Sequence, residues 1–133
     1  EDCSVLFEEP KDVFQMKPDI VIATNDGKNI FIMDTKWKVL SDAKANYGIS
    51  QADMYQMYAY QKKYSSENVT LLYPKTENVS KDDIEFFNQR LTQSLTTPAR
   101  RIIIPTEIKI RFIDLFDLKN SLETIIYEIK KNA

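Results

Sequence analysis

The sequence predicts an α/β fold in which helices flank a mixed central β-sheet. Apolar runs rich in β-branched residues, typical of buried strands, occupy positions 19–24, 30–37 and 69–73. A strong helical pattern lies between the second and third runs, at 50–64, and an amphipathic pattern closes the chain. This mixture of strands and helices over 133 residues indicates a single domain, 1–133, with one hydrophobic core.

The first two runs, 19–24 and 30–37, are predicted to pair as the antiparallel strands of a hairpin. The connection at 25–28 reads Asn-Asp-Gly-Lys, and Asp-Gly is a strong signal for a tight turn. If Asp-Gly is the centre of a two-residue turn, Asp19 lies directly opposite Asp34. A longer loop or a bulge that shifts the register by one residue would separate these two aspartates.

Residues 50–64 are predicted to form a helix. The stretch lacks glycine, proline and β-branched residues, and Ser50 with Asp53 forms a capping box at its start. The side chains expected to share one stripe of this helix are Met54, Met57, Tyr58 and Gln61.

The second half of the chain contains further strand candidates and one ambiguous segment. Strands are expected at 69–73, 101–104 and 108–113, and Pro105 separates the last two because it cannot donate to a sheet ladder. Segment 80–95 fits either a capped helix or a strand. The C-terminal helix is predicted from the spacing of its apolar residues, which are Leu118, Leu122, Ile125, Ile126 and Ile129.

Composition excludes several classes of function. The chain has no histidine, so it cannot form a catalytic triad that needs imidazole or most of the known zinc hydrolase sites. Its net charge of −2 provides no overall basic field, so any contact with DNA needs local basic residues or another chain. Trp37 is interpreted as a packing residue, and the basic pairs at 62–63 and 100–101 as solvated surface residues.

The expected location is the cytoplasm, without membrane insertion. No apolar run approaches the roughly 20 residues that a membrane-spanning helix needs. The single cysteine, Cys3, cannot form an internal disulfide, which is compatible with a reducing compartment. The first residue is Glu1 and not methionine, so we expect the chain to be a C-terminal fragment of a longer protein.

Three charged residues suggest chemistry at the end of the predicted hairpin. Directly opposed residues have Cβ atoms about 4.5–5.5 Å apart, where two like charges destabilise the pair. Asp19 and Asp34 therefore need a neighbouring cation, and period-two alternation places Lys36 on the same face as Asp34. Magnesium suits such a site because it binds few carboxylates and completes its coordination with water and phosphate oxygens. Phosphodiester hydrolysis is one interpretation, and solvated strand ends are the other.

These residues resemble a known motif. Pro18-Asp19 followed by Asp34-Thr35-Lys36 resembles the PD-(D/E)xK motif of restriction-endonuclease-like nucleases, with Asp in place of the more frequent Glu. The helical stretch Gln-Ala-Asp-Met-Tyr at 51–55 is similar to the QxxxY motif of RecB-like members. Within residues 16–75, the chain resembles McrC nuclease subunits of McrBC methylcytosine-dependent restriction systems in the segments MKPDIVI, FIMDTKWK, ISQADMYQMYAYQKKY and LLYPK.

The resemblance implies a restriction-endonuclease-like core and a site with defined roles. Magnesium would be the cofactor, with manganese as a substitute. Many members add an acidic ligand from an upstream helix, but Pro10 indicates an extended segment near Glu8 and Glu9, so that ligand is expected upstream of Glu1. The residues implied are Asp19, Asp34 and Lys36 as catalytic residues; Asp19, Asp34 and the Thr35 carbonyl as metal ligands; and Gln51 and Tyr55 as supporting or DNA-binding residues.

The function that the resemblance implies is a magnesium-dependent DNA endonuclease subunit of a GTP-dependent restriction system. The expected partners are DNA and an AAA+ GTPase similar to McrB, since this chain has no G-x-x-x-x-G-K-[ST] loop of its own. One alternative is a RecB-like repair exonuclease that shares the site but acts at DNA ends. The other is a catalytically degenerate nuclease fold that serves as an interaction module.

Overall fold

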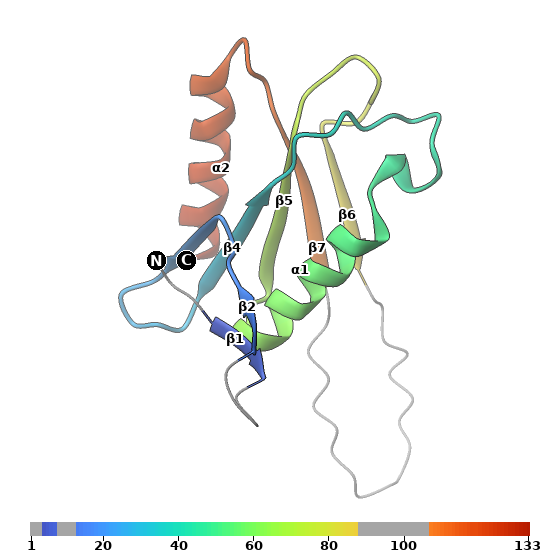
Figure 1. Cartoon of the computed structure of the whole chain (residues 1–133). Helices are drawn as coiled ribbons and strands as arrows, with labels where there is room; N and C mark the ends of the chain where they lie inside the picture. Colours follow the sequence, from blue (N-terminus) through green and yellow to red (C-terminus); the bar gives the residue numbers. More distant parts are fainter. Residues whose placement is uncertain (1–3, 8–12, 88–106) are drawn as a thin grey trace, which may run out of the picture.

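The computed structural model describes residues 4–7, 13–87 and 107–133. It shows a five-stranded mixed sheet, a separate two-stranded sheet and two α-helices (Figure 1), which confirms the predicted α/β fold with a mixed sheet flanked by helices. The elements are β1 (Ser4–Phe7), β2 (Val13–Met16), β3 (Ile20–Ala23), β4 (Ile30–Thr35), the 3-10 turn η1 (Ala45–Gly48), α1 (Gln51–Tyr64), β5 (Asn68–Pro74), β6 (Asp83–Phe87), β7 (Glu107–Ile113) and α2 (Leu118–Asn132).

The order of strands in the large sheet is β3-β4-β5-β7-β6. The three central strands, β4, β5 and β7, are parallel, whereas β3 and β6 pair antiparallel at the two edges. Helix α1 forms the crossover between β4 and β5, as parallel neighbours require. The three parallel strands therefore end at the same edge of the sheet, at Thr35, Pro74 and Ile113.

The predicted hairpin of β3 and β4 is present with the predicted register. Ile20 pairs with Met33 and Ala23 with Ile30, so the next position outward places Asp19 opposite Asp34. This register matters because a shift of one residue would have turned one of the aspartates to the other face of the sheet.

The turn of this hairpin differs from the prediction. The last backbone bond joins the Thr24 amide to the Asn29 carbonyl at 2.9 Å, so residues 25–28 form a four-residue loop and not a two-residue turn. The Asp26 carboxylate accepts hydrogen bonds from the Thr24 hydroxyl at 2.6 Å and the Lys28 amide at 3.1 Å, which stabilises the wider loop. The longer loop takes one additional residue from each strand, so the same residues remain opposite each other and the register is preserved.

The two helices pack on opposite faces of the sheet. Residues of β4 and β5 alternate between these faces, so Ile32 and Leu71 belong to the main core with α1, whereas Met33 and Leu72 pack against Ile125 of α2. The main core on the α1 face consists of Met16, Ile32, Leu40, Ile49, Met57, Tyr60, Val69, Leu71, Tyr73, Val79, Ile84, Ile108 and Ile110.

Helix α1 begins as predicted, but its buried stripe is rotated. Ser50 caps the helix by accepting a hydrogen bond from the Asp53 amide at 3.1 Å. The buried residues are Met57, Tyr60 and Gln61, whereas Tyr58 is 47% exposed. Aromatic and methionine side chains occupy several sides of this helix, so sequence spacing alone did not identify the side that the sheet covers.

Helix α2 is confirmed, and an ion-pair bridge ties it to the sheet. Arg111 of β7 donates from Nε to Glu128 of α2 at 3.1 Å and from Nη2 to Glu85 of β6 at 3.0 Å. Ile125 is the buried apolar residue of this helix, and three others of the predicted stripe remain about half exposed, namely Leu118, Leu122 and Ile126.

The structure tests only those remaining predictions that fall within the described residues. The ambiguous segment 80–95 contains the strand β6, and β7 covers the predicted strand at 108–113. The predicted strand at 101–104, residues 88–95, Cys3, the two glutamates before Pro10 and the basic pair at 100–101 lie outside the described residues. Of the helices within the described ranges, none is long and apolar enough to cross a membrane.

Two buried tyrosines of the main core allow a test of how much a hydrogen bond to a buried hydroxyl contributes to stability. The Tyr73 hydroxyl is buried without a hydrogen-bond partner among the described residues, whereas the Tyr60 hydroxyl accepts from Gln56 Nε2 at 3.0 Å. We expect Tyr73→Phe to leave the free energy of unfolding unchanged or raise it by up to about 1 kcal/mol, because an unpaired buried hydroxyl is costly. Tyr60→Phe should lower it by about 1 kcal/mol. Denaturant unfolding would contradict this if Tyr73→Phe were the more destabilising change.

Candidate active site

The end of strand β4 carries a carboxylate and an ammonium in contact. Asp34 is 4% exposed, and its Oδ2 lies 2.6 Å from the Nζ of Lys36. The backbone amide of Lys36 donates to the Leu72 carbonyl at 2.9 Å, which continues the β4–β5 ladder beyond the end of β4. The pairing with β5 therefore holds both side chains on the α1 face of the sheet, as the alternation predicted.

Asp19 joins this pair from the neighbouring strand. Its backbone amide donates to Asp34 Oδ1 at 3.4 Å, and its own Oδ2 accepts from the Thr35 amide at 2.7 Å and the Thr35 hydroxyl at 2.6 Å. Each carboxylate thus receives hydrogen bonds from the opposite strand, which offsets their mutual repulsion. The structure brings together all four of the residues Asp19, Asp34, Thr35 and Lys36, which we call the carboxylate–lysine cluster.

The charges of the cluster are set by these contacts. The Thr35 hydroxyl and amide hold the pKa of the Asp19 carboxyl below its usual value, so it is ionised at neutral pH. Burial alone would lower the pKa of the Lys36 ammonium, but its hydrogen bond to Asp34 and the charges of Asp34 and Asp53 raise it above the usual value. These contacts therefore favour the charged form of Lys36.

Helix α1 supplies two further partners of Lys36 that the sequence did not reveal. Gln56 Oε1 accepts from Lys36 Nζ at 2.9 Å, and Asp53 Oδ1 lies 3.6 Å from the same nitrogen. Gln56 in turn donates to the buried Tyr60 hydroxyl. A signal for this pair was present, because Gln56 and Tyr60 repeat the Q-x-x-x-Y spacing one residue after the first instance ends.

The first instance of that spacing, Gln51 and Tyr55, is arranged differently. Gln51 Nε2 donates to the Tyr55 hydroxyl, and Tyr55 is 64% exposed. Within the described part of the chain, Lys36 donates a hydrogen bond to Gln56 of the second instance and not to a residue of the first. The supporting or DNA-binding role assigned to Gln51 and Tyr55 stays a prediction.

The cluster offers hard oxygen donors of the kind that magnesium binds. Within the described ranges, no group of three or more histidine, cysteine or carboxylate side chains is placed to hold a metal. Asp19 and Asp34 are two hard carboxylate ligands, and Mg²⁺ is usually held by one or two carboxylates together with water and substrate phosphate. The residues present therefore suit a magnesium ion that shares its coordination with substrate.

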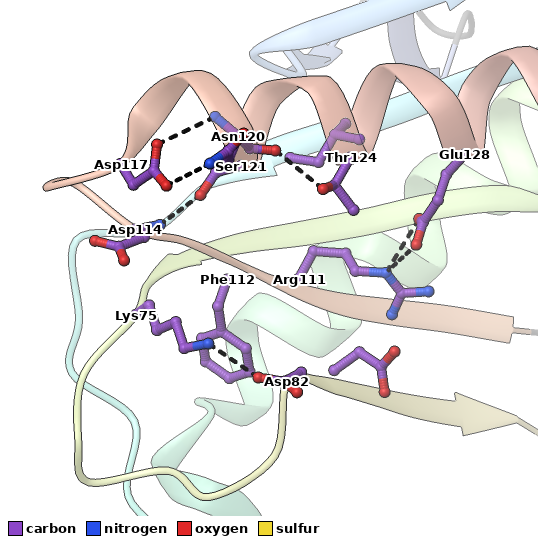
Figure 2. Close-up of a pocket in the computed structure, with 12 residues that line it drawn as sticks. Lys75, Asp82, Arg111, Phe112, Asp114, Asp117, Asn120, Ser121, Thr124 and Glu128 are labelled. Carbon is purple, nitrogen blue, oxygen red and sulfur yellow. Dashed lines mark hydrogen bonds and ion pairs between the residues drawn. The ribbon is translucent and has the colours of Figure 1, made fainter.

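A polar cavity lies elsewhere in the described part of the structure. It has a volume of about 330 Å³ and lies between α2, β7 and the start of β6 (Figure 2), and it contains no residue of the carboxylate–lysine cluster. Its cations already have partners, with Lys75 bound to Asp82 at 2.9 Å and Arg111 to Glu128. We therefore assign no site to this cavity.

Comparison with known proteins gives the family. The family model described as McrBC 5-methylcytosine restriction system component matches residues 2–74. The chain belongs to this family. Family membership indicates a role in a McrBC-type restriction system. No curated protein and no solved structure matches the chain.

The McrBC match covers the part of the chain that builds the cluster. It contains the hairpin of β3 and β4, all of α1, and β5, whereas the cavity of Figure 2 is lined mainly by later residues. Both instances of the Q-x-x-x-Y spacing also fall inside the matched residues.

The contact between Asp34 and Lys36 predicts a measurable coupling free energy between the two side chains, whatever the function of the site. Their side chains are 6% and 18% exposed, so truncating one leaves the other poorly solvated. We expect a double-mutant cycle of Asp34→Ala and Lys36→Ala, measured by denaturant unfolding without metal, to give a coupling of about 1–3 kcal/mol.

The matched control is the exposed pair of Lys75 and Asp82, whose ends are 2.9 Å apart with side chains 46% and 87% exposed. Its coupling should be below about 1 kcal/mol, because solvent screens it. Equal couplings in the two cycles would show that the contact in the cluster is an ordinary surface ion pair.

Proposed function

We propose that this chain is the magnesium-dependent DNA endonuclease subunit of a McrBC-like, GTP-dependent restriction system. The observation that supports this most is the carboxylate–lysine cluster, which assembles two carboxylates and a lysine at the end of β4 inside the McrBC-matched residues. The arrangement agrees with the PD-(D/E)xK pattern read in the sequence. In this proposal the core is of the restriction-endonuclease type.

Magnesium would be held by Asp19 and Asp34, with the Thr35 backbone carbonyl as a further ligand. When bound, it supplies positive charge that polarises the phosphodiester and acidifies water. The low pKa of Asp19 keeps that ligand ionised at neutral pH. The weak 3.4 Å bond from the Asp19 amide leaves Asp34 Oδ1 able to accept a further partner. Manganese would substitute because it takes similar oxygen ligands.

Lys36 would bind the scissile phosphate through its ammonium. Its raised pKa keeps it charged, so it acts by donating hydrogen bonds to phosphate or water and by offsetting negative charge that develops in the transition state. Gln56 Oε1 accepts a hydrogen bond from Lys36 Nζ at 2.9 Å, which fixes the direction of the lysine side chain. Gln56 is thus a positioning residue, while Lys36 is the residue that touches substrate.

The proposal requires two partners. DNA is the substrate, but with a net charge of −2 the chain should hold duplex DNA weakly and with strong dependence on salt. In this proposal the GTPase is another chain, since the 133 residues of the sequence contain no nucleotide-binding G-x-x-x-x-G-K-[ST] loop. An AAA+ GTPase similar to McrB, which would also recognise the methylated base, fits both needs.

The test is cleavage of methylated circular DNA with magnesium, GTP and a McrB-like partner. We expect cutting with all components, little without the partner, and a loss of at least about a hundredfold for Asp34→Ala. Lys36→Ala should also lose cleavage but keep most of its calorimetric affinity for magnesium, because the ammonium is not a metal ligand. Cutting of linear DNA alone would favour a RecB-like exonuclease. A folded chain that never cuts would favour an interaction module.

The two instances of the Q-x-x-x-Y spacing provide a matched pair of variants. Gln56→Leu removes the acceptor that positions Lys36, so we expect the cleavage rate to fall about tenfold or more, which corresponds to the loss of about 1.4 kcal/mol. Gln51→Leu, the same change five residues earlier on α1, should lower the rate less, because Gln51 bonds to Tyr55 and not to Lys36. The reverse ranking in the same assay would assign the catalytic role to the first instance.

A further inference from the structure

The single tryptophan of the chain lies in solvent. Trp37 directly follows Lys36 and is 80% exposed, so the sequence-based interpretation of a packing residue is wrong. Large aromatic side chains usually bury most of their surface. The exposed indole beside a candidate phosphate-binding lysine is therefore accessible to a ligand bound there.

Trp37 stands at the rim of an apolar groove. The groove has a volume of about 330 Å³ and opens at the edge of the sheet where the parallel strands end. Its lining includes Thr35 and Lys36 of the carboxylate–lysine cluster, so the groove borders the cluster at the end of β4. The apolar walls come from Leu72, Pro74, Ile113, Leu115 and Leu118.

Lys36 is the one charged residue among the described residues that line the groove. The nearby Lys38 pairs with Asp53 of α1 at 3.2 Å, and Asp114 and Asp117 line the polar cavity of Figure 2 and not this groove. A strand bound with a phosphate at Lys36 would therefore direct a base, and not a second phosphate, into the apolar remainder of the groove.

We propose that Trp37 stacks on an unpaired nucleobase next to the phosphate held at Lys36, and that the apolar groove receives this base. The inference rests on the proposed function, since it takes the Lys36 phosphate site as given. An aromatic ring accepts any base through its flat face, and the open rim lets the polar edge of the base stay in water. The substrate at this point is single-stranded or locally unpaired DNA.

The border that the groove shares with the cluster favours a base over a protein side chain. A ligand that places its phosphate at Lys36 extends into the space lined by Thr35 and Trp37 without a separate docking event. The contribution expected from one base–aromatic stack is large enough to measure.

The experiment uses the fluorescence of Trp37, which is the only tryptophan in the chain and so reports on this position alone. The chain is titrated without magnesium, to prevent cutting, with a single-stranded oligonucleotide and with an abasic oligonucleotide of equal length. We expect the first to quench the fluorescence and the abasic strand to leave it nearly unchanged. Equal quenching by both would overturn the proposal, because charge alone would then explain the signal.

Variants provide the second readout, as the anisotropy of a labelled single strand. Trp37→Ala should weaken binding by about 5- to 150-fold and Trp37→Phe by much less, in line with the loss of one stack. The matched control is Tyr127→Ala, which removes an aromatic residue that is 66% exposed on α2 and does not line the groove. Unchanged binding by Trp37→Ala would overturn the proposal.

The outcomes separate this inference from the proposed function. Base-dependent quenching by a chain that never cuts DNA would support the base site and reject the nuclease. If Trp37→Ala cut DNA at the normal rate and bound it with the normal affinity, the nuclease would be supported and the base site rejected. Fluorescence that responds to no oligonucleotide but changes when the GTPase partner is added would overturn the proposal and assign the groove to a protein.

Discussion

The contact between Lys36 and Asp34 is the interaction on which the rest of the site depends. Two aspartates face each other at the open end of a hairpin, and the ammonium 2.6 Å from Asp34 supplies the charge that lets them stay there. Desolvation works against this ammonium, so it needs several acceptors. The position of α1 over the end of β4 satisfies that need.

Helix α1 therefore serves two purposes along its length. Met57 and Tyr60 pack against the sheet, while Asp53 and Gln56, closer to its start, reach Lys36. The parallel pairing of β4 with β5 makes this possible, because the crossover helix must return across the same face that carries Asp34. The other face of the same strand ends has no such polar group and is left as the apolar groove beside Trp37.

The proposals follow from this division of the sheet edge into two sides. The α1 side carries charge suited to a metal and a phosphate, and the α2 side carries surface suited to a base. Both meet at Thr35 and Lys36, so one nucleotide could contact both. The polar cavity beneath α2 takes no part, since its ion pairs hold that helix on β7 and β6.

The sequence by itself determined the β3–β4 hairpin, α1, β5, β7, α2 and the pairing of the aspartates, because the spacing of residues along a strand, a helix or a hairpin does not depend on distant residues. The Ser50 cap is local for the same reason. The sequence left β6 open between helix and strand and did not predict β1 and β2. Only the tertiary structure decided which side of α1 meets the sheet, and hence that Gln56 and not Gln51 contacts Lys36. It also decided that Trp37 is exposed, because burial depends on which elements cover a residue, and the described elements leave this residue 80% exposed.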